Sequence, residues 1–353
     1  MRVVHLVPAM EQGGVESVVL NLNRVLAQAG HDSVVISRGG KLVERIESDG
    51  GLHLTLDLKS KNPLTYFTRA WRLRRALKGL KPDLVCAHSR VPAWLFVWAN
   101  RGLKLKWLTY AHGANSVSRY SAVMTKGDAV VVPSQFLAEF LRENYGRVAK
   151  VIPNCVDLAR FDPAAVDRDF IDEKRREWGL AEGAPVTMSI GRITKLKGFD
   201  AVIREFAGRG NGSAVTAPVR EDTDGTGRLV IVGGADKDKG ELLEELKALA
   251  AELGVADRVV FAGNQTKIPE CLMLATEVVS GNMTKPESFG LSVIEAYAMN
   301  KPVRCLKRFG GTAEVMDAVA ALGKPTLREA VAELYSFERF AKNTLALYES
   351  VVL

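Results

Sequence analysis

Residues 186–206 read VTMSIGRITKLKGFDAVIREF, and this stretch decides the fold class. Its first five residues, 186–190, are a short apolar run typical of a buried strand, whereas residues 199–206 have the apolar spacing of a helix. A basic loop with a glycine at each end, 191–198, joins the two. A strand that leads through a loop into a helix is the repeating unit of a parallel α/β sheet.

The same alternation extends in both directions from this stretch. Downstream, the patterns predict strands at 228–232, 259–261 and 277–280, and helices at 241–253 and 290–299. Upstream, they predict strands at 3–7, 33–36, 84–87, 107–110 and 129–132, and helices at 15–29, 64–78 and 135–144. We therefore expect an α/β protein built from two consecutive parallel-sheet units.

The length of 353 residues exceeds one ordinary core and fits two domains. The alternation weakens near 151–154 before it resumes, so we place the domains at 1–157 and 158–336. Residues 208–227 are rich in Gly, Ser, Thr and Asp, which predicts a surface loop. Parallel sheets bind ligands at the carboxyl ends of their strands, so we expect the ligand site in a cleft between the domains.

The composition indicates a globular protein: 47% of the residues are hydrophobic and 25% are charged. Four cysteines stand far apart, without a CxxC pair or a nearby histidine cluster, which argues against a zinc site and a disulfide framework. We expect reduced thiols and a cytoplasmic protein. The four cysteines are Cys86, Cys155, Cys271 and Cys305.

No apolar run approaches the ~18 residues that span a bilayer. The first residues, MRVVHLV, resemble a signal peptide only briefly, because Glu11 and Glu16 follow at once; we interpret them as a strand. The net charge of +7 suits nucleic acid, an anionic membrane or phosphorylated small molecules, and does not choose among them.

The strongest chemical motif is KPESFGLSVIEA at residues 285–296. It predicts a helix start at which the N–H groups of Gly290, Leu291 and Ser292 lack helical partners, an arrangement that binds phosphate. Glu287 lies before the helix, where it can accept hydrogen bonds from sugar hydroxyls. Glu295, about two turns along the helix, can accept from a ribose diol. Helix stabilisation and an ordinary surface glutamate would explain the two carboxylates as well.

Arg192 and Lys197 lie in the loop that directly follows the strand 186–190. Two cations at a strand end can clamp a diphosphate, because arginine offers a planar fork of donors and lysine a compact charge. An exposed basic loop would have the same sequence. The loop 191–198 supplies cations, and the motif 285–296 supplies carboxylates and N–H groups without helical partners. Because each motif lacks what the other has, the two together favour a shared phosphate site.

Two further features belong to the first half. Gly13 and Gly14 lie between the first strand and the first helix, where a backbone without Cβ atoms can approach a phosphate or sugar. A structural turn explains them equally well. His112 ends the strand 107–110 and is expected to face the cleft; a lone histidine is more often structural.

Together these motifs resemble the retaining glycosyltransferases of family 4, which have the GT-B fold: two Rossmann-like domains facing each other across a cleft. The matching positions are Gly13-Gly14, His112-Gly113, Gly191-Arg192, Lys197-Gly198, Glu287 and Glu295 flanking Phe289-Gly290-Leu291, and Gly310-Gly311 with Glu314. Residues 337–353 are similar to the final helix that returns to the first domain. Segments 87–94 and 119–128 are similar to lipopolysaccharide-core mannosyl- and glucosyltransferases, whereas 304–309 depart from the small apolar run of many relatives.

The resemblance implies transfer of a hexose from a UDP- or GDP-linked sugar to a lipopolysaccharide-core or other surface-glycan acceptor, with retention and without a metal or a cofactor. Glu287 would orient the sugar, Arg192 and Lys197 would stabilise the leaving diphosphate, and His112 would contact the sugar. Gln265 would contact the base through its backbone, Phe289 would belong to the donor-binding motif, and Gly14 would contact phosphates or acceptor. A nucleotide-sugar epimerase or a phosphorylase on the same fold remains an alternative.

The stretch 59–81 holds eight cations and no acidic residue, beside apolar residues at roughly helical spacing. A basic amphipathic helix can lie on an anionic bilayer, and would make the protein peripheral on the inner face of the cell membrane. An ordinary crossover helix with a solvated face is the alternative. Nucleic acid is disfavoured, because aromatic residues are not interleaved as stacking requires.

Overall fold

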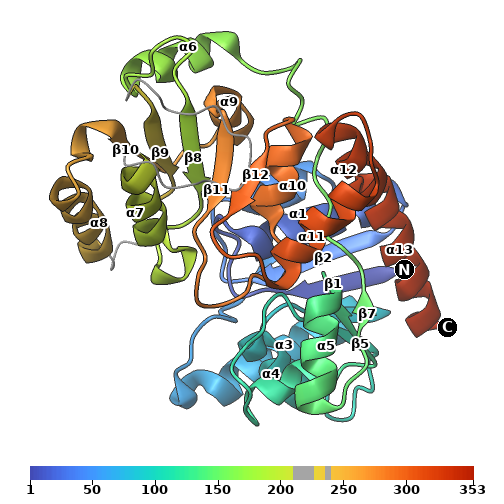
Figure 1. The fold of residues 1–353 in the computed structure, drawn as a ribbon. Coiled ribbons are helices and arrows are strands. Elements are labelled where there is room, and N and C mark those ends of the chain that lie inside the picture. Colours follow the sequence, from blue (N-terminus) through green and yellow to red (C-terminus); the bar gives the residue numbers. More distant parts are fainter. Residues whose placement is uncertain (210–225, 235–239) are drawn as a thin grey trace. The chain divides into compact units, whose positions relative to one another are not determined.

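The computed structural model describes residues 1–209, 226–234 and 240–353, and these form two compact units. The first unit comprises Met1–Cys155 together with Phe337–Leu353, and the second comprises Val156–Ser336. Each has its own parallel sheet and its own buried core (Figure 1). Most of the loop predicted at 208–227 lies outside the described residues.

The first unit is a seven-stranded parallel sheet in the order β3-β2-β1-β4-β5-β6-β7. Its strands are β1 (Arg2–Leu6), β2 (Asp32–Ser37), β3 (Leu52–Thr55), β4 (Leu84–Ala87), β5 (Trp107–Tyr110), β6 (Ala129–Val132) and β7 (Lys150–Val151). Its helices are α1 (Gly14–Gln28), α2 (Val43–Ser48), η1 (Pro63–Thr65), α3 (Tyr66–Leu80), α4 (Arg90–Ala99), η2 (Ser121–Thr125), α5 (Gln135–Tyr145) and α13 (Phe337–Val352).

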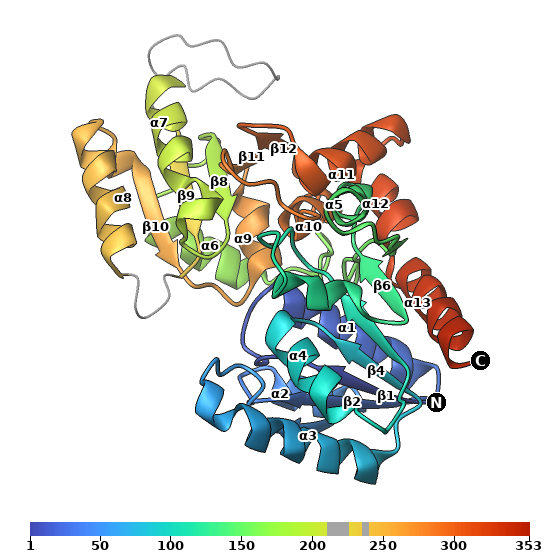
Figure 2. The same cartoon turned by 90° about the horizontal axis from the view of Figure 1, so that it is seen from below.

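Helices cover both faces of this sheet. On one face α1 and α13 pack on a core that includes Leu22, Tyr110 and Tyr348, and on the other α3 and α4 pack around Leu73 and Phe96 (Figure 2). The final helix thus belongs to the first unit, as the resemblance implied. Tyr348 is fully buried, and its hydroxyl lies 2.8 Å from that of Tyr110.

The second unit is a five-stranded parallel sheet in the order β10-β9-β8-β11-β12. Its strands are β8 (Val186–Ile190), β9 (Arg228–Val232), β10 (Val259–Gly263), β11 (Glu277–Ser280) and β12 (Val303–Cys305). Its helices are α6 (Arg168–Glu177), η3 (Lys195–Lys197), α7 (Phe199–Arg209), α8 (Gly240–Glu252), η4 (Ala256–Arg258), α9 (Ile268–Leu274), α10 (Leu291–Ala298), α11 (Gly310–Ala321) and α12 (Leu327–Tyr335).

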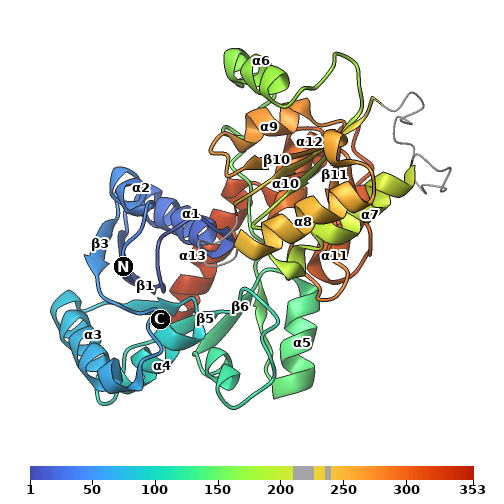
Figure 3. The same cartoon turned by 90° about the vertical axis from the view of Figure 1, so that its left-hand side faces the viewer.

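In the second unit, α7 and α8 lie side by side on one face of the sheet (Figure 3). The opposite face packs against α9, α10, α11 and α12. Because every strand is parallel, the loops that follow β8 and β11 emerge at the same edge of the sheet. This topology brings the two motifs of the second half together.

Candidate functional site

The loop that follows β8 places Lys197 at the carboxyl edge of the second sheet. The aliphatic stem of Lys197 passes over Gly191, where a Cβ would lie 3.2 Å from Lys197 Cε. Gly198 has φ +62°, and a Cβ there would lie 1.9 Å from the carbonyl oxygen of Gly281, the residue after β11. Only glycine allows this close approach of the two loops, so Gly198 sets the distance between them.

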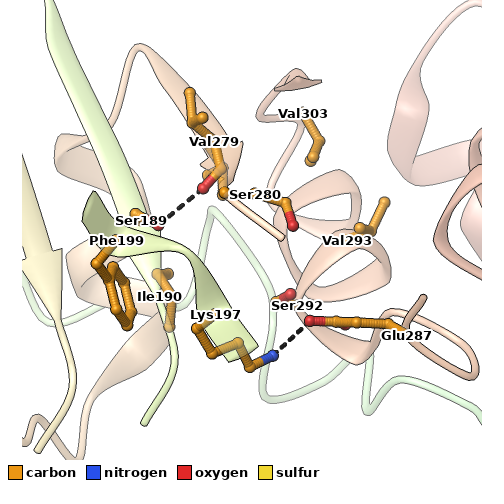
Figure 4. A pocket seen from close by; sticks show the side chains of 12 residues that line it. Ser189, Ile190, Lys197, Phe199, Val279, Ser280, Glu287, Ser292, Val293 and Val303 are labelled. Atoms are coloured by element: carbon orange, nitrogen blue, oxygen red, sulfur yellow. Dashed lines mark hydrogen bonds and ion pairs between the residues drawn. The ribbon is translucent and has the colours of Figure 1, made fainter. Parts of the chain in front are cut away.

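Lys197 and Glu287 form an ion pair beside a pocket at this edge. The Lys197 Nζ and Glu287 Oε1 atoms are 2.6 Å apart, and the two side chains are 34% and 20% exposed. Ser292, in the first turn of α10, lines the same pocket, and Figure 4 shows it next to the pair. The pocket therefore combines a cation, a carboxylate and a helix N-terminus, which suit an anionic phosphate and a polyhydroxylated group.

The backbone around Glu287 is held by the start of α11. The N–H of Gly311 donates to the carbonyl oxygen of Glu287 at 2.8 Å. A Cβ on Gly311 would lie 2.2 Å from the carbonyl oxygen of Ser288. Gly290, the residue before α10, has φ +102°, a left-handed conformation that glycine adopts without strain. The glycine pair at 310–311 thus holds the backbone of residues 286–290, which we call the carboxylate loop.

Glu295 lies close enough to Lys197 for the charges of the two side chains to interact. Burial of its carboxyl raises the pKa of Glu295 to about 7, and the positive charges of Arg160 and Lys197 oppose part of that rise. A carboxyl with this pKa changes protonation near neutral pH, which makes it a candidate for a proton-linked ligand contact.

Three other expected donor-binding residues occupy different surroundings. Arg192 is exposed, and among the described residues it forms no ion pair and does not line the pocket. Gln265 donates from Nε2 to the carbonyl oxygen of Ala262 at 2.5 Å. The Phe289 ring is 5% exposed and packs edge-to-face on Tyr335, with centroids 5.5 Å apart. The Phe289 side chain is thus part of the core, and any ligand contact falls to its main chain.

In the first unit, Gly13 and Gly14 begin α1 at the end of the loop after β1. The expected turn is therefore present, and its N–H groups lie in the first turn of a 15-residue helix. His112 follows β5, and its Nε2 lies 3.0 Å from Nδ1 of His88 in a stacked ring pair. Burial lowers the pKa of His112 to about 4, so the ring is neutral at pH 7.

The basic stretch 59–81 is only partly a cationic surface. Arg69 is 6% exposed and donates to the carbonyl oxygens of Ser60 and Asn62, so it holds the preceding loop instead of facing solvent. Arg74 donates to the carbonyl oxygens of Ala99 and Arg101. Arg69 is buried and Arg74 is half-buried, and both bind backbone carbonyls, so these two of the eight cations do not contribute to an exposed cationic surface. The exposed cations are Lys59, Lys61, Arg72, Arg75, Lys78 and Lys81.

Both halves of the chain match known families. Residues 12–160 match the profile described as "Glycosyltransferase Family 4", and residues 170–337 match "Glycosyl transferases group 1". A D-inositol 3-phosphate glycosyltransferase from Acidothermus cellulolyticus is 32% identical over 57% of this chain and 43% of its own length. An alpha-monoglucosyldiacylglycerol synthase from Streptococcus pneumoniae is 27% identical over 50% of this chain and 36% of its own length.

A solved glycosyltransferase from Rickettsia africae superposes with a TM-score of 0.80 over 99% of this chain and 98% of its own, at 23% identity. HepE from Anabaena, solved in complex with UDP-glucose, superposes with a TM-score of 0.79 over 99% of this chain and 100% of its own, at 16% identity. The chain has the GT-B fold. The matches span less than half the length of the two curated relatives, whose names mention inositol phosphate and diacylglycerol and not a lipopolysaccharide core.

Two buried histidines, His5 and His88, were not among the candidate site residues predicted from the sequence. His5 and His88 lie with His112 in one hydrogen-bonded row, although no motif singled them out as a set. Their only sequence signal is their position on predicted strands: His5 lies within the predicted strand 3–7, and His88 directly follows the predicted strand 84–87. The strand order β1-β4-β5 decides that these ends are neighbours.

Arg304, which departs from the small apolar run of many relatives, has a structural role in this protein. Its guanidinium pairs with Glu277 at 3.2 Å and with Glu205 at 3.1 Å. Glu277 is 1% exposed, so Arg304 neutralises a carboxylate that would otherwise be buried alone. The departure at 304 therefore belongs to a charged pair between β11 and β12.

Two findings concern the expectations about a metal site and a membrane. Within the described ranges, no group of three or more His, Cys, Asp or Glu side chains is arranged to hold a metal ion. Among the helices in that part of the chain, none is long and apolar enough to cross a bilayer.

Proposed function

We propose that this protein is a retaining hexosyltransferase that uses a UDP- or GDP-linked sugar and needs neither a metal nor a cofactor. The observation that carries the proposal is the Lys197–Glu287 pair, 2.6 Å apart, at a pocket that Ser292 of the α10 N-terminus also lines. The cation and the helix N-terminus supply positive potential for a diphosphate, and the carboxylate supplies acceptors for sugar hydroxyls. The UDP-glucose bound to HepE is of this chemical class.

In the proposed reaction, the acceptor hydroxyl attacks the anomeric carbon on the face that the diphosphate leaves. The bond from the anomeric carbon to the phosphate oxygen breaks, the bond to the acceptor oxygen forms, and the leaving phosphate takes the hydroxyl proton. Lys197, Arg192 and the N–H groups at 290–292 stabilise the negative charge that develops on the diphosphate. Glu287 holds the sugar in orientation and forms no covalent bond.

The nucleoside and the first unit complete the proposed site. Glu295 accepts hydrogen bonds from the ribose diol, and the backbone at Gln265 contacts the base. His112 contacts the donor sugar, and Gly13 and Gly14 contact phosphates or acceptor through their N–H groups.

For the acceptor, we propose a lipopolysaccharide-core or other surface glycan, carried on lipid. The relative named for diacylglycerol glucosylation supports a glycolipid, and the segments 87–94 and 119–128 support a lipopolysaccharide core. The proposal places the protein in the cytoplasm, peripheral on the inner face of the cell membrane.

The experiment offers UDP-glucose, UDP-galactose and GDP-mannose in turn, each with lipopolysaccharide core, with diacylglycerol vesicles, with inositol phosphate and without acceptor. Products are identified by mass spectrometry, and the anomeric configuration by NMR, in the presence of a chelator. The proposal requires sugar transfer with retention by the wild type and its loss in Glu287→Gln. Release of nucleoside diphosphate with no sugar on any acceptor, or inversion of the anomeric centre, contradicts it.

The alternative function, an epimerase or phosphorylase on the same fold, is separated by the same samples. An epimerase converts the sugar without any acceptor, and a phosphorylase releases a sugar phosphate when inorganic phosphate replaces the acceptor. Either product from the wild type, with no transfer, would favour the alternative.

We also propose that the region around α3 contacts an anionic membrane surface. Leu64, Phe67 and Trp71 are 88%, 62% and 54% exposed, which is unusual for large apolar side chains. Exposed cations lie on the same stretch, and the Phe67 ring packs edge-to-face on Trp98 at 5.7 Å. Aromatic side chains flanked by cations suit the interface of a bilayer with anionic headgroups.

Co-sedimentation with phosphatidylcholine vesicles, with and without phosphatidylglycerol, tests this surface. We expect binding only to the anionic vesicles, and a loss in both Arg72→Glu/Arg75→Glu and Phe67→Ser/Trp71→Ser. The matched control is Arg142→Glu/Arg168→Glu, which makes the same change in net charge at exposed positions elsewhere. Equal loss in the control would show a net-charge effect and reject a specific surface.

A further inference from the structure

Three histidines form a diagonal row on one face of the first sheet. The register pairs His5 of β1 with Cys86 of β4, and Cys86 with Leu108 of β5. His88 lies two residues beyond Cys86, and His112 lies four beyond Leu108. Because side chains two residues apart share a face, the three rings lie on one face, each step further toward the carboxyl edge.

The rings are joined by two hydrogen bonds. His5 Nδ1 lies 3.0 Å from His88 Nε2, and His88 Nδ1 lies 3.0 Å from His112 Nε2. The ring of Tyr110 stacks on His88 with centroids 4.8 Å apart, which fixes the plane of the middle ring. The row begins in the core, where His5 and His88 are 0% and 3% exposed, and ends at the partly exposed His112.

The protonation of this row is constrained. Burial lowers the pKa values of all three rings, so each is neutral at pH 7 and carries one N–H. Two hydrogen bonds among three neutral rings can run in only two directions. The N–H groups are either all on Nδ1 or all on Nε2.

The inner end of the row distinguishes the two directions. His5 Nε2 is buried and, within the described residues, has no hydrogen-bond partner. If the protons were on Nε2, the row would leave a buried N–H without an acceptor, and such orphaned N–H groups are rarer in proteins than orphaned acceptors. With the protons on Nδ1, His5 leaves only a bare lone pair.

We propose that His88, backed by His5, is a positioning residue that fixes His112 as its Nδ1–H tautomer. His112 then presents a hydrogen-bond donor at the carboxyl edge of the first sheet, held in place by two rings behind it. Use of this donor to bind a hydroxyl of the hexose rests on the proposed function. The row of three histidines does not depend on that function.

The direct test is the tautomer of each ring in protein with 15N-labelled histidine. Long-range 1H–15N spectra at pH 7 separate protonated from unprotonated ring nitrogens, and single substitutions assign the rings. We expect His112 with a protonated Nδ1 and an unprotonated Nε2. A protonated Nε2, or averaged shifts for both nitrogens, would overturn the proposal.

Two substitutions at the middle position sharpen the test. His88→Asn keeps an N–H near the position of Nδ1, and we expect it to preserve the His112 tautomer. His88→Phe keeps a ring without an N–H, and His112 should then show averaged shifts or a protonated Nε2. His53→Gln is the control, because His53 contacts Ser37 outside the row. An unchanged His112 in His88→Phe contradicts a positioning role, and if that variant does not fold, the wild-type tautomer still decides.

Turnover gives a second readout. With the donor and acceptor that the wild type uses, His88→Phe should lower kcat by up to ~10²-fold, as misplacement of a contact group does. We expect His112→Phe to give a similar loss, the double variant no further loss, and His88→Asn to recover most of it. Independent losses in the double variant would contradict the coupling. The expected tautomer in a protein that transfers no sugar would reject the proposed function and leave the row intact.

Discussion

At the scale of single residues, we expect the Lys197–Glu287 pair to matter for the proposed chemistry and little for stability. Both side chains are partly exposed, and such pairs contribute about 0–1 kcal/mol to folding. Loss of one charge that stabilises a transition state costs far more, roughly 10²- to 10³-fold in turnover. Substitutions in this pair are therefore expected to lower turnover while leaving the free energy of unfolding nearly unchanged.

Lys197→Ala, Arg192→Ala and Glu287→Ala should each lower kcat by about 10²-fold or more while the melting temperature stays near that of the wild type. The control is Lys195→Ala, an exposed lysine in the same loop that does not line the pocket. Steady-state kinetics and thermal unfolding measure the two effects. Wild-type turnover in one of the three variants would remove that residue from the site.

If Glu295 binds the donor as proposed, donor binding should depend on pH. Its pKa of about 7 lies above the ordinary value for glutamate, so the carboxylate is mostly ionised at pH 8 and mostly protonated at pH 6. Since the ionised form accepts hydrogen bonds from a ribose diol more strongly, the Kd of UDP-glucose should rise by up to about tenfold between pH 8 and pH 6. Calorimetric titration checks this, and Glu295→Gln should remove the dependence. The same slope in that variant would assign it to another group.

At the scale of elements, two helix starts meet at the carboxylate loop. The backbone of Gly311 at the start of α11 touches Ser288, and this contact leaves no room for a side chain. The position of Glu287 is therefore set by another element and not by its own loop alone.

Gly311→Ala should displace the loop 286–290 and lower kcat/KM by about tenfold or more, since a shift of an ångström at a reacting centre can cost ~10²-fold. Gly208→Ala is the matched control, because a Cβ at this position of α7 meets nothing within 4 Å. The control should keep full activity and gain up to ~1 kcal/mol of stability from helix propensity. Full activity of Gly311→Ala would show that the loop adapts.

At the scale of the whole molecule, each unit is supported by its own buried clusters. One cluster of the first unit takes Phe340 and Tyr348 from the C-terminal helix, so the end of the chain stabilises its beginning. Among the described residues, the clusters of the second unit contain none from that helix.

Phe340→Ala should destabilise the first unit by about 3–5 kcal/mol, because it leaves a cavity in the core. Leu272→Ala, fully buried in a cluster of the second unit, should destabilise the second unit by about 2–5 kcal/mol. Hydrogen exchange resolved by peptide should show faster opening of β1 and β4 in the first variant and of β8 and β11 in the second. Equal acceleration of both sheets in either variant would mean that the units unfold as one.

Much of the fold was predictable from local pattern. The predicted strands 84–87, 107–110, 129–132, 186–190, 228–232 and 277–280 coincide with β4, β5, β6, β8, β9 and β11. Buried parallel strands are continuous apolar runs, which a sequence shows directly. Other elements had no predicted range. The short strands β3, β7 and β12 and the polar helix α6 carry weak periodicity. The remaining α-helices without a predicted range are α2, α4, α9, α11 and α12.

For the site, spacing along the chain was enough where chemistry is local. The motif at 285–296 and the loop at 191–198 were identified from sequence because each combines its charged residues and glycines within a few positions of a strand or helix end. The fate of individual side chains was not local. Phe289 turned inward onto Tyr335, and Arg69 turned onto backbone carbonyls, because burial depends on which elements pack above them.

The amino-acid sequence by itself determined the alternation of strands and helices and the residues that each strand end presents. Only the tertiary structure decided which strand ends are neighbours, and so which of those residues meet. Lys197 reaches Glu287 across 90 positions of sequence, and His5 reaches His88 across 83. The physical reason is that strand pairing and helix packing act between segments far apart in the chain, whereas propensity and periodicity act within a few residues.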